Sequence, residues 1–186
     1  ALGLLARLRL IGQAREVREG DDTRLERRGG LVARWVLVQP TYFQHPRFEQ
    51  LIPRDFDLGA AALTDAQHFL EEQGTRAGTP VFVHLRRGDY LRFPSPEAPA
   101  ALTREWTLAA LQVMRAQVAD PLWVVCSDDL PHVREWFSGE PVLFCERGEL
   151  GDLAVMSLCR AGVLSPSSYS WWAAWLARRR LSEGGE

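Results

Sequence analysis

The chain has 186 residues, of which 46% are apolar and 25% are charged, and its formal net charge is -2. These values are typical of a globular protein with one sizeable core or two modest ones. They exclude a global field that would draw the chain onto nucleic acid or an anionic membrane, so a bound anion needs a local cluster of basic side chains.

The sequence pattern of residues 1–77 predicts a partial α/β region, which precedes a more regular domain. The first apolar run is interrupted by Arg7 and Arg9 and is too short to span a membrane, which favours an amphipathic helix. A β-rich apolar run and a helical segment that ends at Gly74 follow. The predicted helix, strand and helix lie at residues 1–12, 31–43 and 63–74.

The second half alternates short apolar runs with helical segments, four times over. The predicted strands cover residues 80–85, 122–126, 142–145 and 162–165. The predicted helices cover residues 102–120, 131–137, 151–162 and 167–180. Such an alternation with short turns predicts an open parallel sheet of Rossmann type, and we assign residues 78–186 to this domain.

Local signals give the expected ends of these helices. Thr103 is a candidate N-cap, and Asp120 followed by Pro121 is expected to end the same helix. Pro131 suits the first turn of the second helix. Gly162 is expected to close the third helix.

The sequence HLRRGDYL, at residues 84–91, lies where the first predicted strand ends. Because strand side chains alternate between faces, His84 and Arg86 should point one way and Arg87 the other. Ligands of open α/β sheets bind outside the carboxyl ends of the strands. We therefore expect Arg86 to share a cleft with His84, and Arg87 to brace the turn against Asp89 or a carboxylate elsewhere.

The motif alone allows two interpretations equally. The planar guanidinium of Arg86 suits a phosphate, which it binds through two parallel hydrogen bonds. A structural Arg–Asp pair that closes a turn is the other interpretation, and Gly88 would let the chain bend sharply or let a ligand approach. An exposed Arg-Gly-Asp adhesion site is disfavoured because the tripeptide follows a buried strand.

Further polar residues follow the other strands. Ser167 and Ser168 begin the last predicted helix, where hydroxyls and free N–H groups bind anions or simply cap the helix. Two anion-favouring features at strand ends of one sheet favour a diphosphate ligand. Asp128 and Asp152 add acceptors that could take the N1–H and N2–H₂ of guanine, whereas helix capping is the favoured interpretation for Asp129.

Two other groups of residues raise the question of a metal. Cys126, Cys145 and Cys159 lie in apolar runs without a C-x-x-C pair, which favours buried free thiols over a disulfide or metal role. Asp55 and Asp57 form a D-x-D pair of the kind that binds manganese in some enzymes. Its charged neighbours favour a solvated loop, so no metal site is expected.

Three ordered motifs resemble those of glycosyltransferase family 11, the α-1,2-fucosyltransferases. They are HLRRGDYL, VVCSDDL and DLAVMSLCRAGVLSPSSYSWWAAWL, which match the family patterns H-x-R-R-G-D-Y, F-S-D-D and a long third motif that includes N-S-S-F-S-W-W. The third motif is highly specific. Two departures are Pro166 in place of the family's asparagine and the lack of a match to its G-G-L-G-N-Q loop.

The resemblance implies a GT-B fold in which residues 1–77 form part of the acceptor-side domain and residues 78–186 bind GDP-fucose. It implies an inverting transfer of L-fucose to O2 of a terminal galactose on a glycan acceptor, without a metal or other cofactor. Arg86 is then the candidate catalytic residue at the β-phosphate. The implied donor site comprises His84, Arg86, Arg87, Gly88, Asp89, Asp128, Asp152, Ser167 and Ser168.

Within that site the resemblance assigns His84 and Asp152 to guanine, Asp128 to the ribose end and Ser167 with Ser168 to the phosphates. Two alternatives remain: a truncated or degenerate GDP-sugar-binding protein without activity, and a related fucosyltransferase with another acceptor. The chain contains no predicted membrane anchor and no nucleic-acid signature. A cytoplasmic location is expected, with association at the inner face of a bacterial membrane as the alternative.

Overall fold

A computed structural model describes residues 52–53, 55–73 and 78–183 of the chain. The chain divides into two compact units, Ala1–Phe56 and Asp57–Glu186, and every helix and strand of the described residues belongs to the second unit. The helix and strand predicted at residues 1–12 and 31–43 lie outside the described residues.

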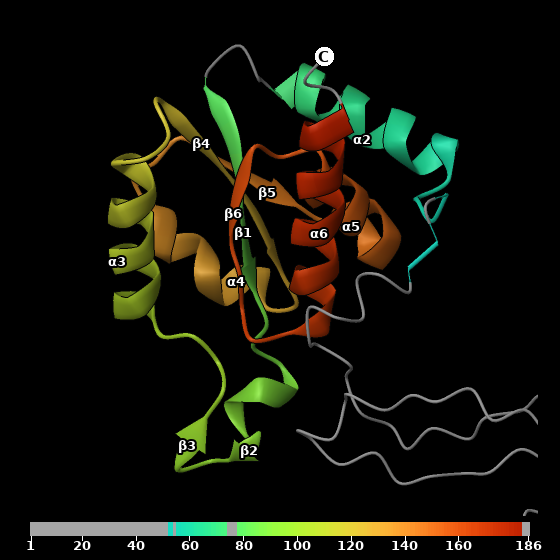
Figure 1. The fold of residues 1–186 in the computed structure, drawn as a ribbon. Coiled ribbons are helices and arrows are strands. Elements are labelled where there is room, and N and C mark those ends of the chain that lie inside the picture. The colour runs from blue at the N-terminus through green and yellow to red at the C-terminus, as the bar shows by residue number, and fades with distance from the viewer. Residues whose placement is uncertain (1–51, 54, 74–77, 184–186) are drawn as a thin grey trace, which may run out of the picture. The chain divides into compact units, whose positions relative to one another are not determined.

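A four-stranded parallel sheet forms the centre of the second unit (Figure 1). Its strands are β1 (Thr79–Leu85), β4 (Pro121–Ser127), β5 (Val142–Cys145) and β6 (Ala161–Val163), in the order β5-β4-β1-β6. Every pairing in this sheet is parallel, so the carboxyl ends of the strands meet at one edge. The predicted parallel α/β sheet is therefore confirmed.

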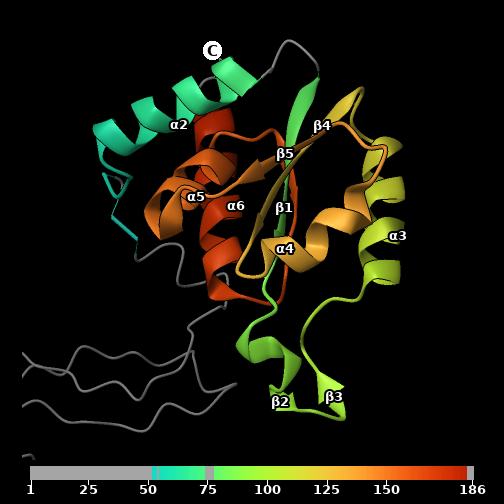
Figure 2. The same ribbon diagram turned by 180° about the vertical axis from the view of Figure 1, so that it is seen from behind.

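Helices cover both faces of the sheet, as the two opposite views show (Figures 1 and 2). One face packs against α3 (Arg104–Arg115), α4 (Leu130–Val133) and the 3-10 turn η4 (Arg134–Phe137). The other packs against α5 (Gly148–Ser157) and α6 (Ser168–Glu183), with α2 (Ala60–Gln73) lying on α5. Each face has its own buried core.

The strand β1 shows how the sequence produces two cores. Val81, Val83 and Leu85 are buried on the α3 face, and Phe82 is buried on the α5 face. This strict alternation follows from the period of two in a strand. Because it continues to the end of the strand, it also decides which side the residues after Leu85 can face.

A short excursion separates β1 from α3. It contains the 3-10 turn η3 (Asp89–Leu91) and a small antiparallel ladder of β2 (Pro94–Ser95) and β3 (Ala98–Pro99). Helix α2, by contrast, belongs to the region assigned to the N-terminal part of the sequence, yet it packs in the same compact unit as the sheet. The boundary between the two proposed domains stays a prediction.

Two predicted helix ends are wrong. Helix α3 begins after Thr103, whose side chain accepts a hydrogen bond from the N–H of Trp106 as predicted, but the helix ends at Arg115. Directly after Arg115, the N–H groups of Ala116 and Gln117 bond to carbonyls three residues back, so the α-helical pattern stops there. Asp120, whose carbonyl accepts the N–H of Thr79 at 2.7 Å, lies outside the helix. Gly162 does not close α5, which ends at Ser157.

Gly162 instead lies inside β6, opposite Phe82 of β1. A Cβ atom at this position would overlap the Phe82 ring, which is only 1% exposed. Gly162→Ala is therefore expected to lower the free energy of unfolding by about 2 kcal/mol through overpacking, as measured by chemical denaturation. Gly59→Ala is the control for added volume, because a Cβ at Gly59 meets no atom within 4 Å, and only the smaller cost of alanine at the residue before α2 is expected. Equal stability of the two variants would contradict this account.

Among the residues that the structure describes, no helix has the combination of length and apolar character that crossing a bilayer requires.

Candidate functional site

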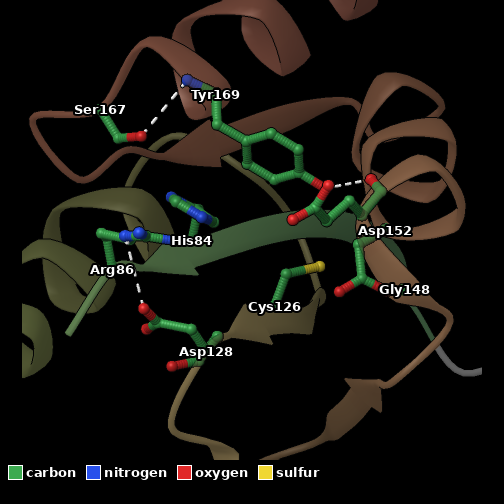
Figure 3. A pocket seen from close by; sticks show the side chains of 10 residues that line it. His84, Arg86, Cys126, Asp128, Gly148, Asp152, Ser167 and Tyr169 are labelled. Carbon is green, nitrogen blue, oxygen red and sulfur yellow. Dashed lines mark hydrogen bonds and ion pairs between the residues drawn. The ribbon is translucent and has the colours of Figure 1, made fainter. Parts of the chain in front are cut away.

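A cavity of about 390 Å³ opens at the carboxyl edge of the sheet (Figure 3). Its walls come from the ends of β1 and β4 and from the first turns of α5 and α6. Five of the predicted site residues line it together, namely His84, Arg86, Asp128, Asp152 and Ser167. The cavity thus lies where ligands of open α/β sheets bind.

Arg86 enters this cavity with its side chain 42% exposed. Its Nε donates to Asp89 Oδ1 at 2.8 Å and lies 3.4 Å from Asp128 Oδ2. The hydrogen bond to Asp89, aided by the charge of Asp128, raises the pKa of Arg86. Its Nη atoms donate no hydrogen bond within the described part of the chain, so the outer end of the guanidinium can meet a ligand.

Arg87 points to the other side, as the alternation predicted. Its Nε donates to Asp129 Oδ2 at 3.1 Å, and its guanidinium carbon lies 5.0 Å from the centroid of the Trp136 ring. Arg87 does not line the cavity and braces the turn against a carboxylate elsewhere. Asp129 stands at the N-cap position of α4, but its side chain makes no capping hydrogen bond, so the favoured interpretation of Asp129 is wrong.

Asp128 holds the turn from inside. One carboxylate oxygen accepts the backbone N–H of Arg87 at 2.7 Å, and the other faces Arg86. A Cβ atom on Gly88 would lie 2.7 Å from that second oxygen, so glycine allows this approach. Gly88 and Asp89 lie beside the cavity without lining it.

A serine that the sequence analysis missed joins β1 to the last motif. The Ser165 hydroxyl donates to the carbonyl of His84 at 2.6 Å and accepts the N–H of Arg86 at 2.8 Å. Ser170 donates to the carbonyl of Ser165 at 2.9 Å. These bonds hold the backbone that leads into Arg86, between the carbonyl of His84 and the N–H of Arg86.

Ser167 and Ser168 differ in their positions. The Ser167 hydroxyl accepts the N–H of Tyr169 at 3.2 Å, lies at the start of α6 and lines the cavity. Ser168 is the first residue of α6 and does not line it. The N-terminus of this 16-residue helix therefore faces the same cavity as Arg86.

His84 forms part of the cavity wall and is only 5% exposed. Its ring centroid lies 5.2 Å from that of Tyr169, and its Nδ1 atom has no hydrogen-bond partner among the residues that the structure describes. Burial lowers the pKa of His84 to about 4; the charge of Asp128 opposes this shift and that of Arg86 adds to it. The imidazole is therefore neutral at pH 7.

The opposite wall comes from α5. Asp152 accepts the N–H of Arg147 at 2.9 Å through one oxygen, and the Tyr169 hydroxyl donates to the carbonyl of Glu149. Burial raises the pKa of Tyr169, so the hydroxyl stays protonated. Tyr169 and Cys126 were not predicted as cavity residues, although both lie within the quoted motifs.

In the D-x-D pair, the carboxylate of Asp57 binds an arginine side chain. Asp57 accepts hydrogen bonds from both terminal nitrogens of Arg180, and one oxygen also accepts the N–H of Leu58 at 2.6 Å. Asp57 thus ties the segment before α2 to the last helix by an ion pair.

Comparison with known proteins shows the family to which the sequence is similar. The model of the family described as glycosyl transferase family 11 matches residues 33–181. A galactoside 2-alpha-L-fucosyltransferase of Bos taurus is 35% identical over 147 residues, which are 74% of this chain and 39% of the relative. A galactoside alpha-(1,2)-fucosyltransferase 2 of Oryctolagus cuniculus is 34% identical over 146 residues, 73% of this chain and 41% of the relative.

The chain thus spans about two fifths of the length of these curated relatives. No solved structure gives a significant match. The family model covers most of the chain, including every motif that lines the cavity. The chain therefore belongs to glycosyl transferase family 11.

Proposed function

We propose that this chain carries the donor-binding part of an inverting galactoside α-1,2-fucosyltransferase with a GT-B fold. The donor is GDP-fucose, and the acceptor is O2 of a terminal galactose on a glycan. One observation carries the proposal: Arg86, Ser167, His84 and Asp152, which come from distant parts of the sequence, line a single cavity. Family membership and the names of the relatives support the same reaction class.

The guanine base is proposed to bind on the α5 side of the cavity. A carboxylate can accept both the N1–H and the N2–H₂ of guanine, and Asp152 lies on this wall with an oxygen that Arg147 does not use (Figure 3). His84 presents a neutral ring and an unpartnered Nδ1 beside it. Asp128, near the end of β4, is proposed to face the ribose.

The pyrophosphate is proposed to bind between Arg86 and the start of α6. The outer end of the Arg86 guanidinium suits two phosphate oxygens at once. Ser167 and the N-terminus of α6 add a hydroxyl and the positive end of a helix dipole. Asp89 contributes indirectly, because its hydrogen bond to Nε orients the guanidinium.

The mechanism follows from where charge develops. Breaking the bond between fucose and the β-phosphate produces positive charge on the sugar and negative charge on GDP. Arg86 stabilises the leaving diphosphate more as its charge grows, which lowers the barrier rather than only tightening binding. We propose that this arginine does the work that a metal ion does in other glycosyltransferases, so that transfer needs no metal or cofactor.

The remaining parts of the proposal concern the whole protein. Residues 1–77 would contribute to the acceptor-side domain, and residues 78–186 to the donor domain. The proposed location is the cytoplasm, with the inner membrane face as the alternative, and no nucleic acid is involved. The alternatives are a GDP-sugar-binding protein without transfer activity and an enzyme with another acceptor, and an activity assay separates them.

GDP is expected to raise the melting temperature of the chain. A ligand at about 100 times its dissociation constant stabilises by about 2.7 kcal/mol, which corresponds to a shift of about 5–10 °C for a chain of this size. ADP is the matched control, because it carries the same diphosphate without the guanine edge that Asp152 would accept. We expect ADP to give a much smaller shift, measured by differential scanning fluorimetry.

Three results would decide between the alternatives. A well-folded chain whose melting is unchanged by GDP would contradict the donor site itself. GDP binding without product, tested with GDP-fucose and lactose in the longest reading frame that contains this chain, would leave the non-catalytic interpretation. Product with other galactosides but not with lactose would change the proposed acceptor, whereas the proposed donor, GDP-fucose, would stand.

A further inference from the structure

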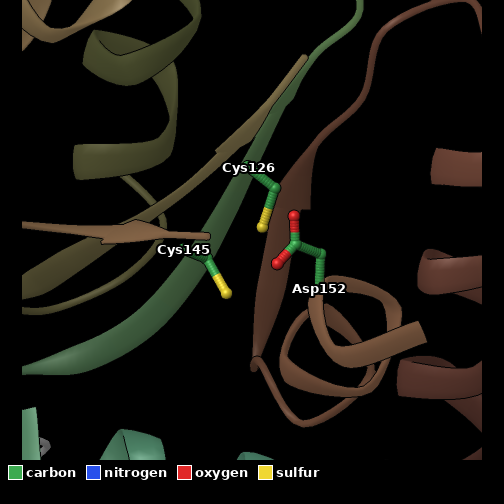
Figure 4. Close-up of side chains that lie close together, drawn as sticks. All are labelled: Cys126, Cys145 and Asp152. Atoms are coloured by element: carbon green, nitrogen blue, oxygen red, sulfur yellow. The ribbon is translucent and has the colours of Figure 1, made fainter. Parts of the chain in front are cut away.

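Three side chains with metal-ligating atoms meet on the α5 face of the sheet (Figure 4). Cys126 of β4 and Cys145 of β5 are direct partners in the parallel pairing, so their side chains leave the sheet on the same side. Asp152 reaches them from α5, and the two sulfur atoms and a carboxylate oxygen all lie within 4.8 Å of one another.

The cavity gives an ion access to this cluster. Cys126 and Asp152 both line the cavity, whereas Cys145 is completely buried behind them. An ion that enters from the cavity would therefore find one thiol and one carboxylate at the wall and a second thiol beneath. Its remaining coordination position would face the cavity.

The donor set selects the kind of ion. Two sulfur ligands and one carboxylate suit Zn²⁺ and other thiophilic divalent cations, not Mg²⁺ or Mn²⁺. In a tetrahedral zinc site the ligand atoms lie about 3.3–3.8 Å apart, given zinc–sulfur and zinc–oxygen bonds of about 2.3 and 2.0–2.2 Å. The three atoms, which lie within 4.8 Å of one another, would have to approach by about 1–1.5 Å at most.

We propose that Cys126, Cys145 and Asp152 bind a Zn²⁺-like cation, and that the bound ion inhibits the protein by competing with the nucleotide for Asp152. Both thiols release a proton to solvent when they become thiolate ligands, and no redox step is involved. The ion is an inhibitor and not a cofactor of transfer. The binding half of this proposal stands on the cluster alone, whereas the competition half rests on the proposed function.

Cadmium is the probe for binding, because cadmium–thiolate bonds give an ultraviolet charge-transfer band. When the reduced chain is titrated with Cd²⁺, the absorbance of this band is expected to rise until one ion is bound per chain and then to stay constant. Prior loading with Zn²⁺ should raise the Cd²⁺ concentration that is needed to develop the band. A wild-type chain that shows no band would overturn the proposal without any variant.

The third cysteine supplies a matched control. Cys159 is 1% exposed and donates to the Val155 carbonyl, but it is not a member of the cluster. Cys126→Ser and Cys145→Ser are expected to weaken Cd²⁺ binding more than tenfold, and Cys159→Ser to leave it unchanged. Asp152→Asn, on a half-buried residue, should weaken binding while the thiolate band persists. Equal losses in all three cysteine variants, or a band retained in the Cys126/Cys145 double variant, would refute the assignment.

Competition is measured separately. GDP is expected to lower the apparent Cd²⁺ affinity of the wild type, and Zn²⁺ to raise the apparent dissociation constant of GDP. Cys145→Ser, which alters no residue of the cavity lining, should retain GDP binding and lose its sensitivity to Zn²⁺. Simultaneous binding of both ligands would overturn the inhibitory role. A chain that does not bind GDP but binds one Cd²⁺ would refute the proposed function and still support the metal site.

Discussion

Replacement of Arg86 by alanine is expected to lower the rate of fucose transfer by about 10²–10³-fold, the usual cost of losing one preorganised group at developing charge. The same change should abolish the thermal shift produced by GDP. The reason is geometric: the Nε of Arg86 is held by Asp89 and Asp128, which leaves the outer guanidinium for the diphosphate. The measurements are turnover of GDP-fucose and the melting curve with GDP.

Two further substitutions separate charge from position. Arg86→Lys keeps the charge but loses the planar fork, so its activity should fall between that of the wild type and that of Arg86→Ala. Arg87→Ala changes the same residue type one position along, where the side chain contacts Asp129 and Trp136 outside the cavity. It should lower the melting temperature yet retain the GDP-induced shift. The reverse pattern in Arg86→Ala and Arg87→Ala would contradict the placement of the two arginines.

The different positions of these arginines were predictable because strand periodicity is a local property. Alternation from Val81 onwards fixes the side to which each residue points, and it holds as far as Arg87. The carboxyl edge as the ligand site is equally a consequence of parallel strands. For this reason the sequence was sufficient to place His84 and Arg86 in one cleft.

The contacts that hold this turn were not predictable to the same degree. Asp129 lies at a position in the sequence that is typical of a helix cap, but its carboxylate accepts a hydrogen bond from Arg87 instead. Ser165 lies 79 residues from Arg86, and its role depends on β6 lying beside β1. No local pattern distinguishes such a serine from any other serine before a helix.

Helix α3 shows a second limit of local patterns. The apolar residues of its sequence that recur at helical spacing are Trp106, Ala109, Ala110, Val113 and Met114. The structure buries Thr107 and Leu111 and leaves Trp106 and Val113 exposed. Burial is decided by the side chains of the opposing strands, so a tertiary constraint selects the buried side of the helix.

The cysteine cluster combines a feature that the sequence predicted with one that it did not. Cys126 and Cys145 lie in apolar strands and are buried free thiols, as the sequence predicted. A hydrogen bond with Cys145, together with burial, raises the pKa of Cys126, so its thiol is protonated in the ion-free protein. That Asp152 lies next to them depends on the packing of α5 against the sheet, which no spacing along the chain encodes.

Acid destabilisation through His84 is the second large expected effect. In the unfolded chain His84 titrates at about pH 6.5, whereas burial lowers its pKa in the folded protein to about 4. Above about pH 6.5 the residue is neutral in both states and contributes no pH dependence. As the pH falls to about 4 the unfolded chain alone gains the proton, and the free energy of unfolding drops by about 3 kcal/mol from this residue.

His84→Phe isolates this contribution, because phenylalanine keeps an aromatic ring against Tyr169 and does not titrate. The unpartnered Nδ1 means that no hydrogen bond is lost at that atom. Urea denaturation of both proteins between pH 4 and pH 7 should give curves that converge or cross as the pH falls, with the wild type losing stability faster. Parallel curves would mean that the buried imidazole titrates at its ordinary pKa, which would contradict the lowering of the His84 pKa by burial.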